Sequence, residues 1–260
     1  MFFLSCNSNF AQIAYTLEQA QAMALSQNKL IVMDFTANWC EPCRKMEVQL
    51  WDSKEFQSLS DRFILLKLDM DQNQILATRY GVTDIPRVIV ITANEDKLWD
   101  QTGFRTPDYH LKALSAFPSS FEALNISLMP VIGKKSTDAE QKMRIGSEFQ
   151  ILALHTSNSN LKQTFFRKSD AYFSKALKYA PNEDYVTEAK LAIILNSVYK
   201  GKHKKALKQI NKMEINSQSE RIEELKNFIF AFCYKCEGDE QQMNTYKAKI
   251  RNQNMLARLD

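Results

Sequence analysis

Residues 30–50 of this chain read LIVMDFTANWCEPCRKMEVQL, and they predict a strand, a corner with two cysteines and a helix. The run 30–35 is apolar and rich in β-branched residues except at Asp34, which predicts a strand buried on both faces. Residues 44–50 carry apolar side chains at helical spacing, which predicts an amphipathic helix. At the corner between strand and helix, Cys40 and Cys43 are separated by two residues. Such a pair can close into a disulfide and reopen, so we interpret it as a redox-active site.

The position of Cys40 at the start of a helix has a chemical consequence. Unpaired backbone N–H groups and the positive end of the helix dipole favour a thiolate there, and the thiolate is the attacking species in disulfide exchange. We therefore predict that Cys40 is the nucleophile and that Cys43, one turn later and more buried, resolves the mixed disulfide. Pro42 is expected to stiffen the helix start. Glu41 is expected to oppose thiolate formation and to make the dithiol more reducing.

Length, charge and apolar content set the outer bounds. A chain of 260 residues fits two domains, each large enough to bury its own core. Residues 1–118 carry a formal charge of −3, and residues 119–260 one of +7. Because charge runs mostly face water, we interpret the lysines of 200–205 as a solvated helix surface and expect no nucleic-acid partner. No stretch reaches the roughly 20 continuous apolar residues that span a bilayer, so no integral membrane segment is expected.

The N-terminal stretch 1–15 begins with a short apolar run followed by small and polar residues, without a basic n-region. It resembles the tail of a secretory signal peptide whose beginning is missing, with cleavage after Ala11 or Gln12. Leu4-Ser5-Cys6 resembles a bacterial lipoprotein box, with Cys6 as the lipidated residue. We therefore predict an extracytoplasmic location in the bacterial periplasm. A cytoplasmic location, with these residues as a frayed N-terminus, stays open.

Two segments of different kind follow. From 16 to 118, predicted helices and strands alternate, which indicates an α/β domain. Its predicted elements are a helix at 17–27, strands at 30–35, 63–68, 87–92 and 97–101, and helices after the cysteine pair, at 73–80 and at 107–116. Residues 119–136 are predicted as a linker or partial helix. Residues 137–260 are predicted as an all-α domain, with helices at 138–156, 161–179, 184–199, 203–213, 218–236 and 239–257.

Two motifs in the α/β segment resemble the signature stretches of the thioredoxin family. They are Asp34-Phe35-x-Ala37-x-Trp39-Cys40-x-Pro42-Cys43 and Gly81-Val82-Thr83-Asp84-Ile85-Pro86. The stretch 67–73 resembles the family's central strand and following turn. The long N-terminal helix and residues 43–56 are more similar to periplasmic thioredoxin-like domains, and the Glu41-Pro42 dipeptide resembles that of extracytoplasmic reductases. The resemblance covers the segment 16–118 and implies a central mixed sheet flanked by helices.

The resemblance also implies a proton carrier. In the family, the position of Asp34, partnered by a lysine that Lys67 would match, moves the proton to or from the resolving cysteine. Burial raises the pKa of an acid, because it disfavours the charged form. A proton acceptor is needed because the Cys43 thiol must lose its proton before it can attack. The alternative is a purely structural buried polar pair.

Substrate contacts are implied on the other side of the cysteines. A cis peptide before Pro86 would place Ile85 beside them, with its backbone free to pair with an extended substrate. Trp39 is expected to lie beside the Cys40 sulfur and to contact substrate, with core packing as the alternative. Arg87 stands where the family often has a small polar residue, and it is expected to bias the site towards acidic partners.

The helical half contains a second pair with the same spacing, Cys233 and Cys236, inside an apolar helical stretch. We interpret them as buried structural cysteines, with an exposed disulfide or a second electron-relay pair as alternatives. No spacing of histidines and cysteines supplies the four ligands of a zinc site, so no metal is expected. Residues 171–181 and 201–207 resemble pieces of tetratricopeptide helices, which predicts a degenerate helical repeat. An unrelated helical bundle is the alternative.

These observations predict a thiol-disulfide oxidoreductase that exchanges protein disulfides through Cys40 and Cys43, as a reductant rather than an oxidant. No metal, flavin or nicotinamide is implied beyond the redox-active disulfide, so electrons must come from an external protein donor. One alternative is a disulfide isomerase whose helical domain dimerises the protein or grips unfolded clients. Another is a binding scaffold whose helical domain is the surface for a protein partner.

Overall fold

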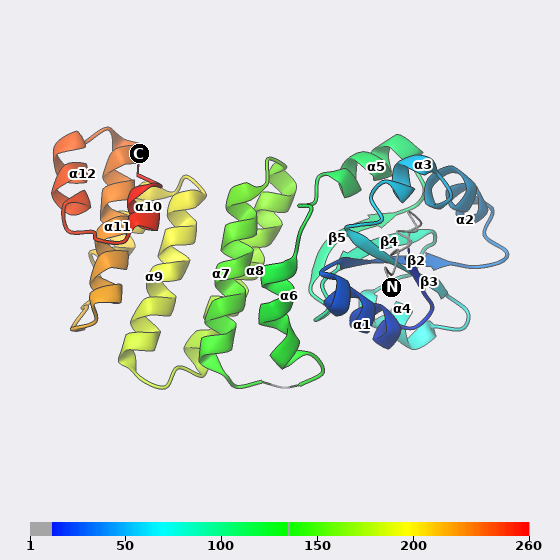
Figure 1. The fold of residues 1–260 in the computed structure, drawn as a ribbon, viewed down its shortest axis with the longest axis horizontal. Coiled ribbons are helices and arrows are strands. Elements are labelled where there is room, and N and C mark those ends of the chain that lie inside the picture. The colour runs from blue at the N-terminus through cyan, green and yellow to red at the C-terminus, as the bar shows by residue number, and fades with distance from the viewer. Residues whose placement is uncertain (1–11, 135, 260) are drawn as a thin grey trace, which may run out of the picture. The chain divides into compact units, whose positions relative to one another are not determined.

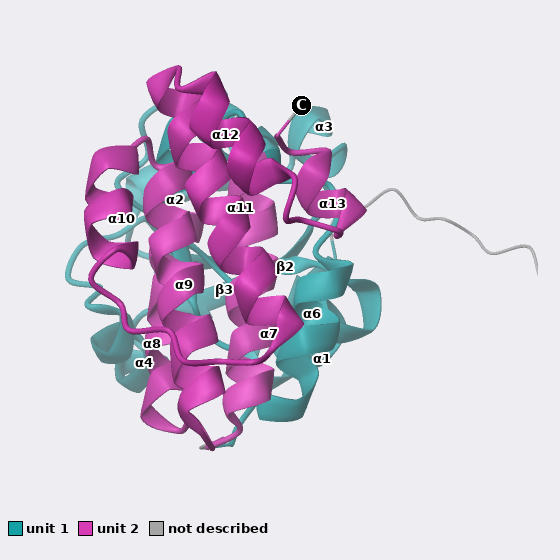
Figure 2. Cartoon of the chain, turned by 90° about the vertical axis from the view of Figure 1, so that its left-hand side faces the viewer, with its two compact units in different colours: residues 1–135, 155–164 teal, residues 136–154, 165–260 magenta. Residues whose placement is uncertain are grey.

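The computed structural model describes residues 12–134 and 136–259, and it shows an α/β part followed by a helical part (Figure 1). The chain forms two compact units (Figure 2). The first comprises residues 1–135 and 155–164, and the second comprises residues 136–154 and 165–260. Among the described residues, no helix is both long enough and apolar enough to cross a membrane.

The first unit is built on a five-stranded mixed sheet with the strand order β1-β3-β2-β4-β5. β1 and β2 run parallel to β3 between them, while β4 runs antiparallel to both of its neighbours. The predicted α/β fold is therefore confirmed. The strands are β1 Gln12–Ala14, β2 Leu30–Thr36, β3 Phe63–Asp69, β4 Arg87–Ile91 and β5 Lys97–Thr102.

The central strand β2 is buried on both faces, as its apolar sequence predicts. One face packs against α1 (Leu17–Gln27) and α4 (Gln74–Tyr80), in a core that includes Ile31, Met33 and Phe35. Because side chains alternate along a strand, Asp34 points to the opposite face. Helices cover that face as well, and Figure 1 shows them on the other side of the sheet from α1 and α4. They are α2 (Glu41–Met46), the π-helix η1 (Glu47–Trp51), α3 (Lys54–Gln57) and α5 (Pro107–Ser115).

The first unit extends beyond the predicted domain at both ends. At its start, β1 pairs with β3 from Gln12 onward, so the predicted start at residue 16 is too late. At its end, most of the predicted linker 119–136 is helical, as α6 (Glu122–Leu128) and the 3₁₀ turn η2 (Met129–Val131). Asn125 of α6 is buried, and its Nδ2 donates to the carbonyls of Ala24 and Lys29, both at 3.2 Å. These bonds tie α6 to the end of α1. Cys6 and the predicted cleavage site after Ala11 lie outside the described residues or at their edge.

The second unit consists of helices joined by turns. Its polar core centres on the buried Asn196, whose Oδ1 accepts from Gln150 Nε2 at 2.8 Å and whose Nδ2 donates to Ser169 Oγ at 2.9 Å. Asn196 Nδ2 also donates to Asp170 Oδ1 at 2.7 Å. The helices are α7 Ala139–His155, α8 Ser159–Lys178, α9 Glu183–Tyr199, α10 His203–Ile210, α11 Glu220–Glu237, α12 Glu240–Lys247 and α13 Gln253–Leu256, and the first residues of α8 belong to the first unit.

The single helix predicted at 239–257 is wrong, because the chain breaks between α12 and α13. The backbone N–H groups of Arg251 and Asn252 donate to Glu224 Oε1 of α11, at 2.7 and 3.0 Å. A carboxylate from another helix thus replaces the helical carbonyl partners at this point. The side chain of Asn252 then caps α13. This pairing is a tertiary contact, so the helical pattern of the sequence does not reveal it.

The second cysteine pair lies in α11, and its two members differ. Cys233 is buried, and its Sγ donates to the carbonyl of His203 at 3.7 Å. Burial raises the pKa of the Cys233 thiol to about 12. Cys236 is exposed, so the prediction that both cysteines are buried is wrong for this residue. Both are free thiols rather than a disulfide.

Candidate active site at the cysteine pair

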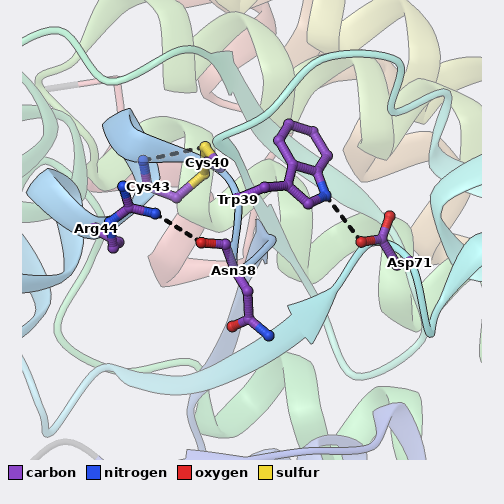
Figure 3. The surroundings of a disulfide bond; sticks show 6 residues. All are labelled: Asn38, Trp39, Cys40, Cys43, Arg44 and Asp71. Atoms are coloured by element: carbon purple, nitrogen blue, oxygen red, sulfur yellow. Dashed lines mark hydrogen bonds between the residues drawn. A yellow bond between two sulfur atoms is a disulfide. The ribbon is translucent and has the colours of Figure 1, made fainter.

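Cys40 and Cys43 form a disulfide at the start of α2, with an S–S distance of 2.03 Å and a Cα–Cα distance of 5.3 Å (Figure 3). Cys40 is the N-cap of this helix, and its Sγ accepts a hydrogen bond from the backbone N–H of Cys43 at 3.2 Å. Pro42 occupies the first turn, where its missing N–H costs no hydrogen bond. The sulfur of Cys40 therefore lies where backbone donors favour a negative charge.

Burial does not distinguish the two cysteines. Each has 4% of its surface exposed, so the prediction that Cys43 is more buried than Cys40 is wrong. The two differ in their place on the helix, because Cys40 caps α2 and Cys43 lies inside its first turn. An assignment of nucleophile and resolving thiol therefore has to rest on this position.

Trp39 stands out beside the disulfide as an exposed aromatic side chain. It is 66% exposed, so core packing does not explain it. Its Nε1 donates to Asp71 Oδ2 at 2.9 Å, and Figure 3 shows the indole extending from the cysteine loop toward this carboxylate. On the other side of the loop, Arg44 Nη1 donates to the carbonyl of Asn38 at 2.7 Å. These two bonds hold the loop that precedes Cys40.

Ile85 reaches the cysteines from the loop between α4 and β4. α4 ends at Gly81, whose φ of 67° suits glycine because it lacks a Cβ atom. The peptide bond between Ile85 and Pro86 is cis. The side chain of Ile85 packs against the small cluster formed by Cys40, Cys43 and Ala37.

Asp34 is a buried acid on the sheet face that α2 and η1 cover. It is 2% exposed, and its Oδ1 has no hydrogen-bond partner among the described residues. Burial raises the pKa of Asp34 to about 7, and the negative charge of Glu47 adds to the rise. Lys67 and the indole N–H of Trp51 oppose it more weakly. Asp34 can therefore take up or release a proton near neutral pH.

Lys67 is paired with Glu47, not with Asp34. It lies beside Asp34 in the sheet, where the two residues are in register on β3 and β2. Its Nζ nevertheless makes an ion pair and hydrogen bond with Glu47 Oε1, from the first residue of η1. Glu47 is not among the site residues predicted from the sequence. Its spacing could have revealed it, since a residue four positions after Cys43 lies on the same helix face.

Two further residues were expected to tune the site, and both have their charge compensated. Glu41 accepts a hydrogen bond from Lys45 at 2.8 Å, and this exposed pair holds the pKa of Glu41 below its ordinary value. Arg87 forms two hydrogen bonds with Asp100, one of them from Nη2 to Oδ2 at 2.8 Å. Its guanidinium is therefore engaged along the β4–β5 edge, so the expected bias of the site towards acidic partners is not supported.

Residues 12–115 match the protein-family model described as Thioredoxin. Thioredoxin H4 of Arabidopsis thaliana is 44% identical over 78 residues, which are 29% of this chain and 63% of that protein. Thioredoxin of Bacillus subtilis (strain 168) is 35% identical over 66 residues, which are 25% of this chain and 62% of that protein. The chain thus spans less than two thirds of the length of these relatives.

Among solved structures, the solution structure of a thioredoxin from Thermus thermophilus is similar with 21% identity and a TM-score of 0.37. The match covers 40% of this chain and 85% of that chain. The family match coincides with the five-stranded sheet and includes the cysteine pair at the start of α2. Residues 12–115 of this chain are therefore similar to the thioredoxin family.

Proposed function

We propose that this protein is a thiol-disulfide oxidoreductase that reduces disulfides in other proteins through Cys40 and Cys43. The observation that carries the proposal is the disulfide at the N-cap of α2, where the Cys40 sulfur already accepts the Cys43 N–H. The same donors would stabilise the Cys40 thiolate after reduction. The sequence similarity of residues 12–115 to thioredoxins supports this chemistry.

The reaction proceeds in two exchange steps. The Cys40 thiolate attacks one sulfur of the substrate disulfide, which forms a mixed disulfide and expels the other substrate sulfur as a thiolate. Cys43 then loses its proton, and its thiolate attacks the Cys40 sulfur. This step closes the Cys40–Cys43 disulfide and expels the second substrate thiolate. The substrate disulfide is reduced to a dithiol, while the protein dithiol is oxidised, so that an external protein donor must reduce it again.

Asp34 is proposed as the proton acceptor for Cys43. Its buried position on the strand that leads into the cysteine corner, together with a pKa raised to about 7, suits this role. We propose that Glu47 and Lys67 adjust this proton transfer, since the charge of Glu47 raises the pKa of Asp34 and the charge of Lys67 lowers it. Lys67 acts on Asp34 as a positioning residue, because its own hydrogen bond goes to Glu47.

Substrate is proposed to bind over the Cys40–Cys43 disulfide, next to the exposed Trp39. Trp39, the residue before Cys40, offers an exposed apolar face, and Ile85 packs against the cysteines themselves. An extended substrate chain could pair with the backbone before Pro86.

The proposed direction is reductive, and it rests on the resemblance of the Glu41-Pro42 dipeptide to that of extracytoplasmic reductases, since Lys45 compensates the charge of Glu41. Equilibration of the purified protein with glutathione or dithiothreitol buffers, read by alkylation and mass, measures the reduction potential. A value near about −270 mV or below supports a reductant. A value of about −120 to −180 mV would instead indicate an oxidant or isomerase.

Active-site substitution tests the chemistry itself. Cys40→Ser should abolish the reduction of a protein disulfide in the presence of dithiothreitol. Cys43→Ser should instead accumulate a mixed disulfide through Cys40, visible as an adduct by mass. Cys236→Ser, which changes an exposed cysteine of the second pair, is the matched control and should leave the rate unchanged. Full activity of Cys40→Ser would refute the proposal.

For the helical unit we propose a degenerate tetratricopeptide-like repeat that binds a protein partner. Its succession of helices from α7 to α12 supports this proposal. If the unit were the sole functional surface, the variant Cys40→Ser/Cys43→Ser would keep the function of the protein in cells. The proposed location is extracytoplasmic, on the basis of residues 1–15, and cell fractionation tests it.

A further inference from the structure

We infer that a groove between the start of α1 and α4 binds an extended segment of the substrate protein, one with an apolar side chain next to a basic one. This inference rests on the proposed function, and it adds a binding surface beyond the substrate contacts proposed at Trp39 and Ile85. The groove has a volume of about 630 Å³ and lies entirely in the first unit. It is lined by Tyr15, Leu17, Glu18, Asp71, Ile75 and Arg79, among others.

The apolar part of the groove is exposed to an unusual degree. Ile75 is 83% exposed and Tyr15 is 66% exposed, although each is flanked by buried neighbours of the same core, Ala77 and Leu17. An exposed isoleucine and tyrosine that line one depression offer a binding site for an apolar side chain. Covering them would remove apolar surface from water, which favours binding.

The charge of the groove is negative. Glu18 and Asp71 are both exposed acids on its wall. The one basic residue that lines it, Arg79, donates to Glu95 Oε2 at 3.0 Å, so its charge is compensated. A lysine or arginine next to the apolar side chain would therefore find complementary charge, whereas an acidic segment would be repelled.

The groove is continuous with the redox site through one hydrogen bond. Asp71 lines the groove and also accepts the hydrogen bond of Trp39, the exposed residue beside Cys40 (Figure 3). Asp69 holds this rim, because its Oδ1 accepts from the backbone N–H groups of Asp71 and Gln72, at 2.9 and 3.2 Å. A polypeptide attached to a sulfur at Cys40 can thus cross Trp39 and continue into the groove. This continuity favours a segment of the substrate over a free small molecule.

The experiment compares two synthetic peptides with the same disulfide, using the full chain. One carries an arm with leucine next to lysine, and the other a glycine-serine arm. We expect kcat/KM for the leucine-lysine peptide to be higher by about tenfold, the effect of one well-placed contact region. Ile75→Ser and Glu18→Lys should both remove this preference. Glu18→Lys should also transfer it to a peptide with leucine next to glutamate.

Matched controls exist on α6 of the same unit. Ile126→Ser changes another exposed helical isoleucine, and Glu122→Lys reverses another exposed acid in the first turn of a helix. Both should keep the preference of the wild-type protein. Loss of the preference in these controls as strongly as in Ile75→Ser and Glu18→Lys would overturn the inference.

Binding of the arm alone separates this inference from the proposed function. A leucine-lysine peptide without cysteine should shift the NMR methyl signals of Ile75 but not those of Ile126. If neither peptide disulfide is reduced but the Ile75 signals shift, the proposed redox function is wrong and the proposed binding groove is supported. Equal kcat/KM for both peptides, or no shift at Ile75, overturns the groove. So does a dimer that dissociates in Ile75→Ser, because a second copy of the chain would then be the occupant.

Discussion

Lys67 donates to Glu47, although its neighbour in register on the adjacent strand is Asp34. The ammonium of Lys67 thus acts on the charge of two acids and is bonded to one of them, Glu47. Because this ammonium is bonded to Glu47, it lowers the pKa of Asp34 by less than burial raises it. Burial therefore holds the pKa of Asp34 near 7. The start of the π-helix at Glu47 therefore contributes to the chemistry of a strand residue.

Glu47→Gln should lower the pKa of Asp34. The change removes a negative charge that raises this pKa, and it releases Lys67 to act on Asp34 alone. The NMR titration of the Asp34 carboxyl carbon measures the shift, and the rate at which Cys43 resolves a mixed disulfide should fall off at a correspondingly lower pH. Glu41→Gln is the control, since the exposed Glu41 pairs with Lys45 and does not act on Asp34. An unchanged Asp34 titration in Glu47→Gln would contradict the prediction.

Asp34→Asn should make the protein more stable at neutral pH than the wild type. The pKa of Asp34 is about 7 when folded and about 3.9 when unfolded, so the folded state holds its proton more tightly. The stabilisation that this provides is full below pH ~3.9 and is lost as pH rises to about 7. The free energy of unfolding of the wild type therefore falls by about 4 kcal/mol over this range. The Asp34→Asn variant has no carboxyl group at this position and should not show this fall. Urea denaturation of both proteins from pH 4 to pH 8 measures the difference, which should grow with pH and then level off above 7.

His110 should make the first unit sensitive to acid. It is fully buried against Phe104 and Trp99, and neither ring nitrogen has a hydrogen-bond partner among the described residues. Burial lowers its pKa to about 4, with a smaller contribution from Arg105. The unfolded state therefore binds the extra proton first, and stability is lost as pH falls from 6.5 to 4, by up to about 3 kcal/mol. His110→Phe should remove this fall of the unfolding free energy between pH 6.5 and pH 4. Altered packing in the variant would shift its stability by the same amount at every pH and would leave this comparison intact.

Gly146→Ala should destabilise the second unit, although alanine is the better helix former. A Cβ atom at Gly146 would lie 2.6 Å from Cδ1 and Cε1 of Phe173, whose buried ring has little room to move. Such overpacking costs about 1–3 kcal/mol, against about 1 kcal/mol gained from helix propensity. Thermal or urea denaturation measures the net loss. Adding Phe173→Leu to the Gly146→Ala variant should recover part of the lost stability. If Gly146→Ala alone is as stable as the wild type, the ring of Phe173 can shift and the prediction is wrong.

Local sequence predicted the site better than its surroundings. The spacing of Cys40 and Cys43 and the apolar run before them depend on neighbours along the chain, so the corner from strand to helix could be read directly. The burial of Asp34 followed from the same run. The ion pair of Glu47 could not be read, because it depends on how a helix lies over the sheet.

Boundaries and surface charge were predicted least well. Arg87 is engaged by Asp100, a residue of the neighbouring strand, and the break before α13 depends on Glu224 of another helix. In each case the partner is far away in sequence or on another element. A pattern of single residues carries no information on which acid will meet which base.

Three features could be predicted from neighbours along the chain: the α/β order of the first unit, the helical nature of the second unit and the redox pair. They follow from the periodicity of apolar residues and from two cysteines one helical turn apart. Four other properties became visible only in the folded chain: the partner of Lys67, the equal burial of Cys40 and Cys43, the attachment of α6 to α1, and the exposure of Cys236. These properties arise from packing between distant segments, where burial and charge depend on neighbours that local patterns do not name.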